Sequence, residues 1–391
     1  MNYSDEEQVL ATKIQGLSER YKDDQLSLLK SLTSVDCGTG NLVGNGEVVA
    51  ILTKELEKLG ADVKIIKAEN VGQHIVAYIK PEKPTGKIIV NAHIDTVFEK
   101  GSVAKHPFTI KDDMAYGLGT ADDKGGVVVI LYGLKIALEL GAKLSKEICI
   151  IFNCDEETGS DSAKEIFLQE GKGADYAMFF EPVVGENTVI TKRQGVGRYS
   201  MAVTGVAAHS GIDFFKGRNA ITELSHKICD VHSLTNIRPG ITVNVGTVEG
   251  GTMVSTVPEY AHTEFCVRVN NAKEMELLRE KISDIEHSTH IQGCKTAVNG
   301  RFTYYPMDRT DAILSIYNRA KDAAQLVGID LCEEYANAGA DVCHMNQFGV
   351  TAIDGFGPLQ YNIHTFDEHV NIPSIVQKTN LFAAMLVTHR I

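Results

Sequence analysis

Acidic and histidine-containing clusters follow the apolar stretches of this chain, at the points where a strand would end. His93 follows the β-rich stretch 87–92, and Glu157 comes soon after a second such stretch, 148–153. Asp122 lies in a glycine-bounded segment directly ahead of a helical stretch. In open α/β sheets, ligands bind just outside the carboxyl ends of the strands. The pattern therefore predicts an α/β layer fold with a hydrolytic two-metal site at its strand ends.

The length and the order of the segments predict two domains. The chain has 391 residues, which exceeds the roughly 250–300 residues that one hydrophobic core usually supports. Alternating strand and helix patterns indicate a three-layer α/β catalytic domain with a mixed, mainly parallel sheet, formed by residues 1–191 and 302–391. Residues 192–301 have the pattern of a separate α+β unit. We therefore expect this unit to be inserted into the catalytic domain.

The charge balance and the termini exclude several classes of partner. Asp and Glu number 51 and Lys and Arg 38, giving a net charge of -13, which disfavours nonspecific binding to nucleic acid or to anionic membranes. No apolar run approaches the roughly 20 residues of a membrane span, and the acidic N-terminus is unlike a signal peptide. The sequence thus predicts a cytoplasmic protein that acts on small molecules or peptides.

The eight cysteines are distributed without any C-x-x-C pair. Several lie within apolar strand or helix patterns, which is typical of small buried side chains. We expect reduced thiols, with neither a disulfide framework nor a thiolate zinc site.

His93 and Asp95 are one residue apart, so an extended backbone directs both side chains to the same face. A carboxylate in this position can hold one ring nitrogen while the other binds a metal. Taken alone, the pair fits a hydrogen-bonded structural histidine better than a metal ligand, but its position directly after an apolar strand favours the functional interpretation. Asp122 and Asp123 are adjacent and repel each other, which favours a cation between them, and one carboxylate can bridge two metals. The alternative for either aspartate is a helix N-cap.

Glu156 and Glu157 are neighbours at a strand end and point in different directions. One can bind a metal while the other takes a proton from water, although a solvated acidic loop is the alternative.

Glu181 and His364 each follow a further apolar segment. Imidazoles and carboxylates without thiols suit Zn²⁺, or Co²⁺ or Mn²⁺. The candidate ligands are His93, Asp122, Glu157, Glu181 and His364.

The motifs resemble those of the dizinc aminoacylase/carboxypeptidase family, which includes acetylornithine deacetylases, succinyl-diaminopimelate desuccinylases, peptidase T and bacterial glutamate carboxypeptidase. They occur in the family's order and span nearly the whole chain. The matching segments are His93-Ile-Asp95-Thr-Val, Gly-Thr-Ala-Asp122-Asp123-Lys-Gly-Gly, Asp155-Glu156-Glu157-Thr-Gly-Ser, Phe180-Glu181-Pro, Ala208-His209-Ser-Gly and His364-x-x-x-Glu368.

The resemblance implies two Zn²⁺ ions per subunit, with Co²⁺ or Mn²⁺ as alternatives. It assigns His93, Asp122 and Glu181 to one metal, and Asp122, Glu157 and His364 to the other. It makes Asp95 the partner of His93 and implies a cis peptide bond after Asp122. It also implies that Glu156, as general base, activates a metal-bridging water for attack on an amide.

The same resemblance gives residues 192–301 the role of a ferredoxin-like lid and dimerisation domain. In many members the histidine that matches His209 reaches the active site of the partner subunit and helps to hold the developing oxyanion. The resemblance therefore implies a homodimer formed through this domain.

The segments 100–108 and 37–41 look most like the glutamate carboxypeptidase branch. Arg301 and Arg268 are then candidates to bind the substrate's carboxylate, because a guanidinium fits it in a bidentate manner, and Asn244 is a further substrate-binding candidate. Arg268 fits a structural role in the sheet equally well.

The expected function is release of a C-terminal amino acid, with glutamate as one candidate, from small peptides or N-acyl amino acids. An N-acyl amino acid deacylase of the acetylornithine or succinyl-diaminopimelate type is the alternative, and a non-catalytic dimer that binds amino-acid derivatives is a more distant one. The segment Ala338-Gly-Ala340-Asp341 and Ser255 depart from the branch's usual pattern, which leaves the substrate open.

Overall fold

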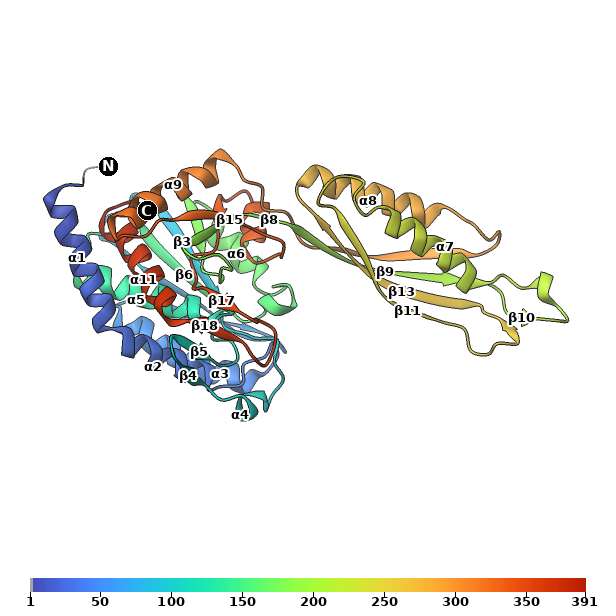
Figure 1. Cartoon of the computed structure of the whole chain (residues 1–391), viewed down its shortest axis with the longest axis horizontal. Helices are drawn as coiled ribbons and strands as arrows, with labels where there is room; N and C mark the ends of the chain where they lie inside the picture. Colours follow the sequence, from blue (N-terminus) through green and yellow to red (C-terminus); the bar gives the residue numbers. More distant parts are fainter. Residues whose placement is uncertain (1–2) are drawn as a thin grey trace. The chain divides into compact units, whose positions relative to one another are not determined.

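Residues 3–391 are described by a computed structural model (Figure 1). They form two compact units. The first comprises residues up to Lys192, Arg309–Tyr335 and Ala340–Ile391, and the second comprises Arg193–Asp308 and Ala336–Gly339. The second unit extends past residue 301 because its last strand pairs along its whole length and ends at Tyr304.

A six-stranded sheet forms the centre of the first unit. Four neighbouring strands run parallel, and one strand near the edge runs against them. This arrangement confirms the predicted mixed, mainly parallel α/β fold. From one edge to the other the strands are β1 (Asp62–Ala68), β2 (Gly72–Ile79), β6 (Glu147–Asn153), β3 (Lys87–His93), β7 (Tyr176–Phe179) and β16 (Ala352–Ile353).

The central strands are rich in Ile and Val and are buried along almost their whole length, as expected when helices cover both faces of a parallel sheet. Helix α5 lies against β3 and packs on α11. Among the described residues, no helix is both long and apolar enough to cross a membrane. The helices are α1 (Asp5–Arg20), α2 (Lys22–Thr33), α3 (Leu42–Lys58), α4 (Ser102–Lys105), α5 (Lys124–Glu139), α6 (Lys164–Gly171), α9 (Asp311–Leu326), α10 (Val342–Gln347) and α11 (Ile372–Val387).

Two small sheets complete the first unit. One pairs β8 (Thr188–Arg193) with β15 (Cys332–Ala336). The other has the order β17-β18-β5-β4, and its β5–β18 pair places residues near 117 beside residues near 368. Its strands are β17 (Gln360–Tyr361), β18 (His369–Asn371), β5 (Met114–Tyr116) and β4 (Thr109–Lys111).

The second unit is a four-stranded antiparallel sheet with two helices. Its chain order β9-α7-β11-β13-α8-β14 and sheet order β11-β13-β9-β14 are those of a ferredoxin-like fold. Burial alternates along β13, so one face packs on the helices and the other is more open to solvent. The elements are β9 (Gly195–Thr204), β10 (Ala208–His209), α7 (Ala220–Ser233), β11 (Thr242–Gly250), β12 (Thr256–Val257), β13 (Tyr260–Val269), α8 (Ala272–His287) and β14 (Lys295–Tyr304).

All eight cysteines are free thiols, and five of them are buried. Cys229 and Cys332 are exposed, so these two differ from the small buried side chains that the apolar patterns predict.

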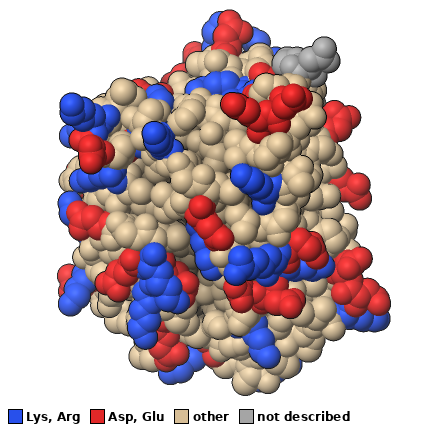
Figure 2. Space-filling model, turned by 90° about the vertical axis from the view of Figure 1, so that its left-hand side faces the viewer, with Lys and Arg blue, Asp and Glu red and all other residues tan. Residues whose placement is uncertain are grey.

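Charges of both signs are mixed over the face of the protein shown in Figure 2. Acidic and basic side chains lie next to one another there, and the described residues form no broad area of one sign on this face. A phosphate backbone binds to an extended basic surface, which this face does not offer.

Candidate active site

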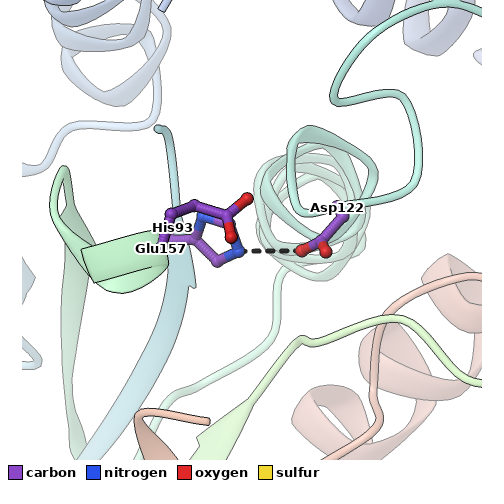
Figure 3. Close-up of side chains that lie close together, drawn as sticks. All are labelled: His93, Asp122 and Glu157. Carbon is purple, nitrogen blue, oxygen red and sulfur yellow. Dashed lines mark hydrogen bonds and ion pairs between the residues drawn. The ribbon is translucent and has the colours of Figure 1, made fainter. Parts of the chain in front are cut away.

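The candidate metal ligands converge because three parallel strands end side by side. His93 is the last residue of β3, and its neighbours β6 and β7 lead directly to Glu157 and Glu181. Asp122 precedes the first turn of α5, and His364 lies in the loop between β17 and β18. Figure 3 shows His93, Asp122 and Glu157 with their polar atoms directed toward one another.

Asp122 lies between the two histidines. Its Oδ1 is 2.9 Å from Nε2 of His93, and its Oδ2 is 3.3 Å from Nε2 of His364. Glu157 Oε2 is 3.2 Å from the His364 ring nitrogen, and Glu181 Oε1 is 3.7 Å from that of His93. Each oxygen of Asp122 thus faces a different imidazole, and each imidazole has a second carboxylate beside it.

These residues fit a pair of divalent cations. The ligand atoms of His93, Asp122 and Glu157 all lie within 4.8 Å of one another, as do those of His93, Asp123 and Glu181. Asp123 accepts a hydrogen bond from the His93 backbone, while its Oδ1 is buried without a hydrogen-bond partner. Asp123 occupies the N-cap position of α5 but makes no side-chain capping bond to the helix. The bond between Asp122 and Asp123 is cis, which confirms the expectation.

The electrostatics of the site favour positive charge. Burial alone would lower the pKa of His93, but its hydrogen bonds to Asp122 and Asp95 raise that pKa well above its usual value. Hydrogen bonds to Asp122 and Glu157 likewise raise the pKa of His364 to about 10. Desolvation raises the pKa of Glu157, and the neighbouring Asp122 charge adds to this effect. The two histidines and Glu157 thus bind protons more readily than they do in water, and a metal cation would supply the same positive charge.

Asp95 connects His93 to the turn that carries the two glutamates. The Nδ1 atom of His93 lies 3.1 Å from the backbone oxygen of Asp95 and 3.3 Å from its Oδ1. The same carboxylate accepts the backbone N–H groups of Glu156 and Glu157, at 3.2 and 3.3 Å. Thr39 donates its hydroxyl to Asp95 at 2.6 Å. Thr39 was not identified from the sequence.

Glu156 is half-buried and begins the short 3₁₀ turn Glu156–Thr158. Desolvation raises its pKa well above the usual value, and the charges of Glu181 and Asp341 raise it further. A carboxylate with a raised pKa is a stronger proton acceptor, which is what a general base requires.

A chain of hydrogen bonds that was not identified from the sequence supports this turn. Asp155 accepts the backbone N–H and the hydroxyl of Ser162, at 2.8 and 2.6 Å. Since that hydroxyl donates to Asp155, His74 Nε2 donates to the Ser162 oxygen at 2.9 Å, and His74 Nδ1 accepts from the Cys154 backbone at 3.2 Å. A buried histidine inside a strand pattern was the only sequence signal for this chain of contacts.

Asp341 supports the same loop from another segment. It is buried and accepts hydrogen bonds from Asn153 Nδ2, at 2.5 Å, and from the Ser160 hydroxyl. Burial raises the pKa of Asp341 to about 7. In the sequence, this segment stands out only as a departure from the family pattern. In the structure, Asp341 contacts Asn153 and Ser160, which flank the turn that carries the two glutamates.

The second unit holds the candidate substrate-binding residues. Asn244, Cys266, Arg198 and Arg301 are consecutive partners across its four strands and form one row on the more open face. A groove of about 580 Å³ on this face is lined in part by Asn244 and Arg198. Arg198 was not singled out from the sequence.

Arg268 and His209 lie elsewhere in this unit. Arg268 donates through Nη1 to the backbone oxygen of Asn337 at 2.5 Å, a contact in keeping with its structural alternative. His209 is exposed on β10, and its Nδ1 accepts the backbone N–H groups of Gly211 and Ile212, both at 3.1 Å.

Comparison with known proteins identifies the family. The sequence model of peptidase family M20/M25/M40 matches residues 89–388. Carboxypeptidase G2 from Pseudomonas sp. strain RS-16 is 28% identical over 380 residues, which are 93% of this chain and 90% of that protein. Acetylornithine deacetylase from Vibrio parahaemolyticus is 28% identical over 240 residues, which are 58% of this chain and 61% of that protein.

Solved structures agree on the fold. The aminopeptidase PepT from Bacillus cereus superposes with a TM-score of 0.77 at 21% identity, covering 93% of this chain and 98% of that one. An M20 family metallo-carboxypeptidase from Sulfolobus solfataricus gives 0.74 at 17% identity, with 94% and 99% covered. The family match, the hydrolases among the relatives and the clustered ligands confirm the resemblance: the chain belongs to peptidase family M20/M25/M40 and is an enzyme of the dinuclear metallopeptidase type.

Proposed function

We propose that this enzyme releases a C-terminal amino acid from small peptides or N-acyl amino acids by hydrolysing an amide bond. The observation that carries the proposal is the position of Asp122, whose two carboxylate oxygens each face a different histidine. This is the arrangement of a carboxylate shared between two metals. Glu157 and Glu181 supply one further carboxylate beside each histidine.

Two Zn²⁺ ions are the proposed cofactors, and Co²⁺ or Mn²⁺ suit the same donors. His93, Asp122 and Glu181 would hold one ion, and Asp122, Glu157 and His364 the other. When bound, such ions act as Lewis acids on an amide carbonyl and on water.

Glu156 is the proposed general base. Its raised pKa favours uptake of the proton from the attacking water. It then returns that proton to the leaving nitrogen, so that the amide becomes a free amine and a carboxylate. Asp95 holds Glu156 and His93 in fixed positions relative to each other, because its carboxylate contacts both residues. We propose that His209 reaches the active site of the partner subunit and donates a hydrogen bond to the developing oxyanion there.

A substrate with a free carboxylate fits the row of side chains on the second unit that is formed by Asn244, Cys266, Arg198 and Arg301. Arg198 and Arg301 are direct cross-strand partners. A carboxylate bound by the two guanidinium groups would form charge-assisted hydrogen bonds. The similarity to a carboxypeptidase along 93% of the chain supports the same substrate class.

An N-acyl amino acid deacylase is the second candidate, and the similarity to acetylornithine deacetylase favours it. Both activities cleave an amide next to an amino-acid carboxylate, so they share the proposed residues. They differ in the group on the other side of the amide.

We further propose a homodimer formed through the second unit. Strand β11 is an edge strand, with one side of its backbone unpaired within the sheet. Large apolar side chains are strongly exposed in this unit, at Phe215 (92%), Ile212 (80%) and Val254 (104%). Exposed apolar residues of this kind mark protein interaction surfaces.

Hydrolysis of a substrate panel tests the proposal. The purified protein is assayed with glutamyl dipeptides, other dipeptides, N-acetyl and N-succinyl amino acids, before and after chelation and after return of Zn²⁺, Co²⁺ or Mn²⁺. We expect release of a free amino acid that is lost on chelation and restored by metal. Preference for dipeptides supports the carboxypeptidase, and preference for N-acyl substrates supports the deacylase. Turnover that is unaffected by complete metal removal would contradict both.

A further inference from the structure

Glu368 has no part in the mechanism above, although it follows His364 by four residues. It ends the loop between β17 and β18, and its side chain is only 1% exposed. A carboxylate buried this deeply needs hydrogen bonds to replace those that it makes with water.

The partners of Glu368 are backbone groups of the segment that carries Asp122. Oε1 accepts the N–H groups of Ala121 and Asp122 at 2.9 and 3.1 Å, and Oε2 accepts that of Gly119 at 2.9 Å. The backbone oxygen of Glu368 accepts the N–H of Gly117 at 3.1 Å. Glu368 thus binds four of the six residues from 117 to 122.

Apart from Glu368, the loop that contains His364 is held by Phe366, whose ring stacks on that of His106 with centroids 4.2 Å apart and lies 5.8 Å from that of Phe98. His364 itself has a φ of 62° in the left-handed region, and its side chain is about half exposed. Within the loop, the backbone bonds are local, from Thr365 to Asn362 at 3.3 Å and from Glu368 to Thr365 at 3.2 Å. The contacts of this loop with the Asp122 segment are thus made by Glu368, by the His364 side chain beside Asp122, and by the short β5–β18 pair that follows.

We propose that Glu368 is a positioning residue that fixes the shared ligand Asp122 relative to His364, and so holds together the metal site formed by Asp122, Glu157 and His364. This inference rests on the proposed metal assignment. His93 and Glu181 belong to strands of the central sheet and do not depend on Glu368. The site that contains His364 should therefore be the more sensitive of the two.

Glutamine is the informative substitution because it keeps the shape of the side chain. One carboxylate oxygen becomes an NH₂ group, which cannot accept a hydrogen bond and meets a backbone N–H instead. Glu368→Gln therefore removes part of the connection without leaving a cavity. Glu368→Asp keeps the charge but is one methylene shorter, so it should reach fewer of the three N–H groups.

The second unit supplies a matched control. Glu223 is also 1% exposed, and it accepts the backbone N–H groups of His290 and Ile291. Glu223→Gln makes the same chemical change to a buried carboxylate that accepts backbone N–H groups, in the unit that holds none of the proposed metal ligands. It also removes the ion pair of Glu223 with Lys227, so it is the more severe of the two changes to local stability.

The test is a titration of metal-free protein with Co²⁺ in competition with a chromophoric chelator, together with the visible spectrum of bound Co²⁺. Wild type and Glu223→Gln should bind two ions per chain with equal affinities. Glu368→Gln should keep one ion at wild-type affinity and bind the second about 10- to 100-fold more weakly, as expected for the loss of an outer partner of a ligand. Its spectrum should lack the contribution of the second ion.

The outcomes separate this inference from the proposed function. If the wild type does not bind two ions, the metal assignment fails. If the wild type binds two and Glu368→Gln binds both with unchanged affinity and spectrum, the positioning role of Glu368 is overturned, as it is if Glu223→Gln weakens binding equally. Should Glu368→Gln not fold, Glu368→Asp decides, because the inference predicts selective weakening of one ion for it too.

Discussion

Both units of this enzyme present clusters of polar side chains, but those of the first unit are much more buried, and His364 alone among the candidate metal ligands is exposed. His93 and Asp95 are each 1% exposed and Asp123 is fully buried, whereas Asn244 and Arg301 are exposed. Burial of an ionised group costs several kcal/mol unless it is paired. The strand ends of the first unit are therefore suited to a resident cation, while the open row of the second can bind and release an anion without that cost.

The cores differ in the same way. The second unit packs aliphatic and aromatic residues such as Val203, Leu224, Phe265 and Leu278 between its sheet and helices. The first unit combines a similar apolar interior with a cluster of carboxylates that raise one another's pKa values. Ligands should therefore change the stability of the first unit much more than that of the second.

The largest expected effect is on turnover. Glu156→Gln removes the proposed base and should lower kcat about 10²- to 10⁴-fold, while both metals remain bound. Steady-state kinetics and metal analysis of the same sample measure the two properties. Glu157→Gln is the matched comparison, since it should lose metal as well as activity. Unchanged kcat in Glu156→Gln would remove this residue from the role of base.

Metal binding should stabilise one unit selectively. At a metal concentration of 1,000 times Kd, a ligand that binds only the folded state adds about 4 kcal/mol to the free energy of unfolding. Hydrogen exchange should then slow for amides of β3 and β6 and stay unchanged for those of β9 and β13. Equal slowing in both units would contradict the assignment of the metals to the first.

Substitutions on the open face of the second unit should act on substrate binding. Loss of a charge-assisted hydrogen bond costs about 1.5–3 kcal/mol, so Arg301→Gln and Arg198→Gln should each raise KM at least about tenfold for substrates with a free carboxylate. Substrates amidated at that group should be affected little. Arg268→Gln serves as the comparison and should lower the stability of the second unit instead, because Arg268 binds the Asn337 backbone. A KM effect confined to Arg268→Gln would reverse these assignments.

The last prediction concerns the pH dependence of stability. Burial lowers the pKa of His344 from 6.5 to about 3, so below pH 6.5 the unfolded chain takes up a proton that the folded chain does not. The contribution of this residue to stability is complete above pH 6.5 and decreases as the pH falls toward 3, by up to about 1.4 kcal/mol per pH unit. Urea unfolding of His344→Leu should show a shallower loss of stability over this range, with the exposed His232→Leu as control. If stability falls with pH at the same rate in the wild type and in His344→Leu, His344 does not contribute to the pH dependence of stability.

The sequence was sufficient for the parts of the site that depend on strand order. Once parallel strands are recognised, His93, Glu157 and Glu181 must meet at one edge of the sheet. Asp122 and His364 were identified as candidate ligands from their residue types and neighbours, but strand order could not place them, because helix starts and loops have no fixed position relative to that edge.

The supporting residues could not be predicted because their contacts join distant segments. Thr39 and Asp95 are 56 residues apart, and Ser160 and Asp341 are 181 apart. Glu368 was visible in a motif, but its three backbone partners depend on how β5 pairs with β18. Side-chain spacing alone carries no information on such contacts.

The central claim is that Asp122 is shared between two metal ions. A crystal structure of the Zn²⁺-loaded enzyme, with anomalous scattering measured at the zinc edge, tests it most directly. The account predicts two peaks about 3.5–4 Å apart, one on each side of the Asp122 carboxylate, with His93 at one and His364 at the other. A single peak, or two peaks of which neither or only one contacts Asp122, would contradict it.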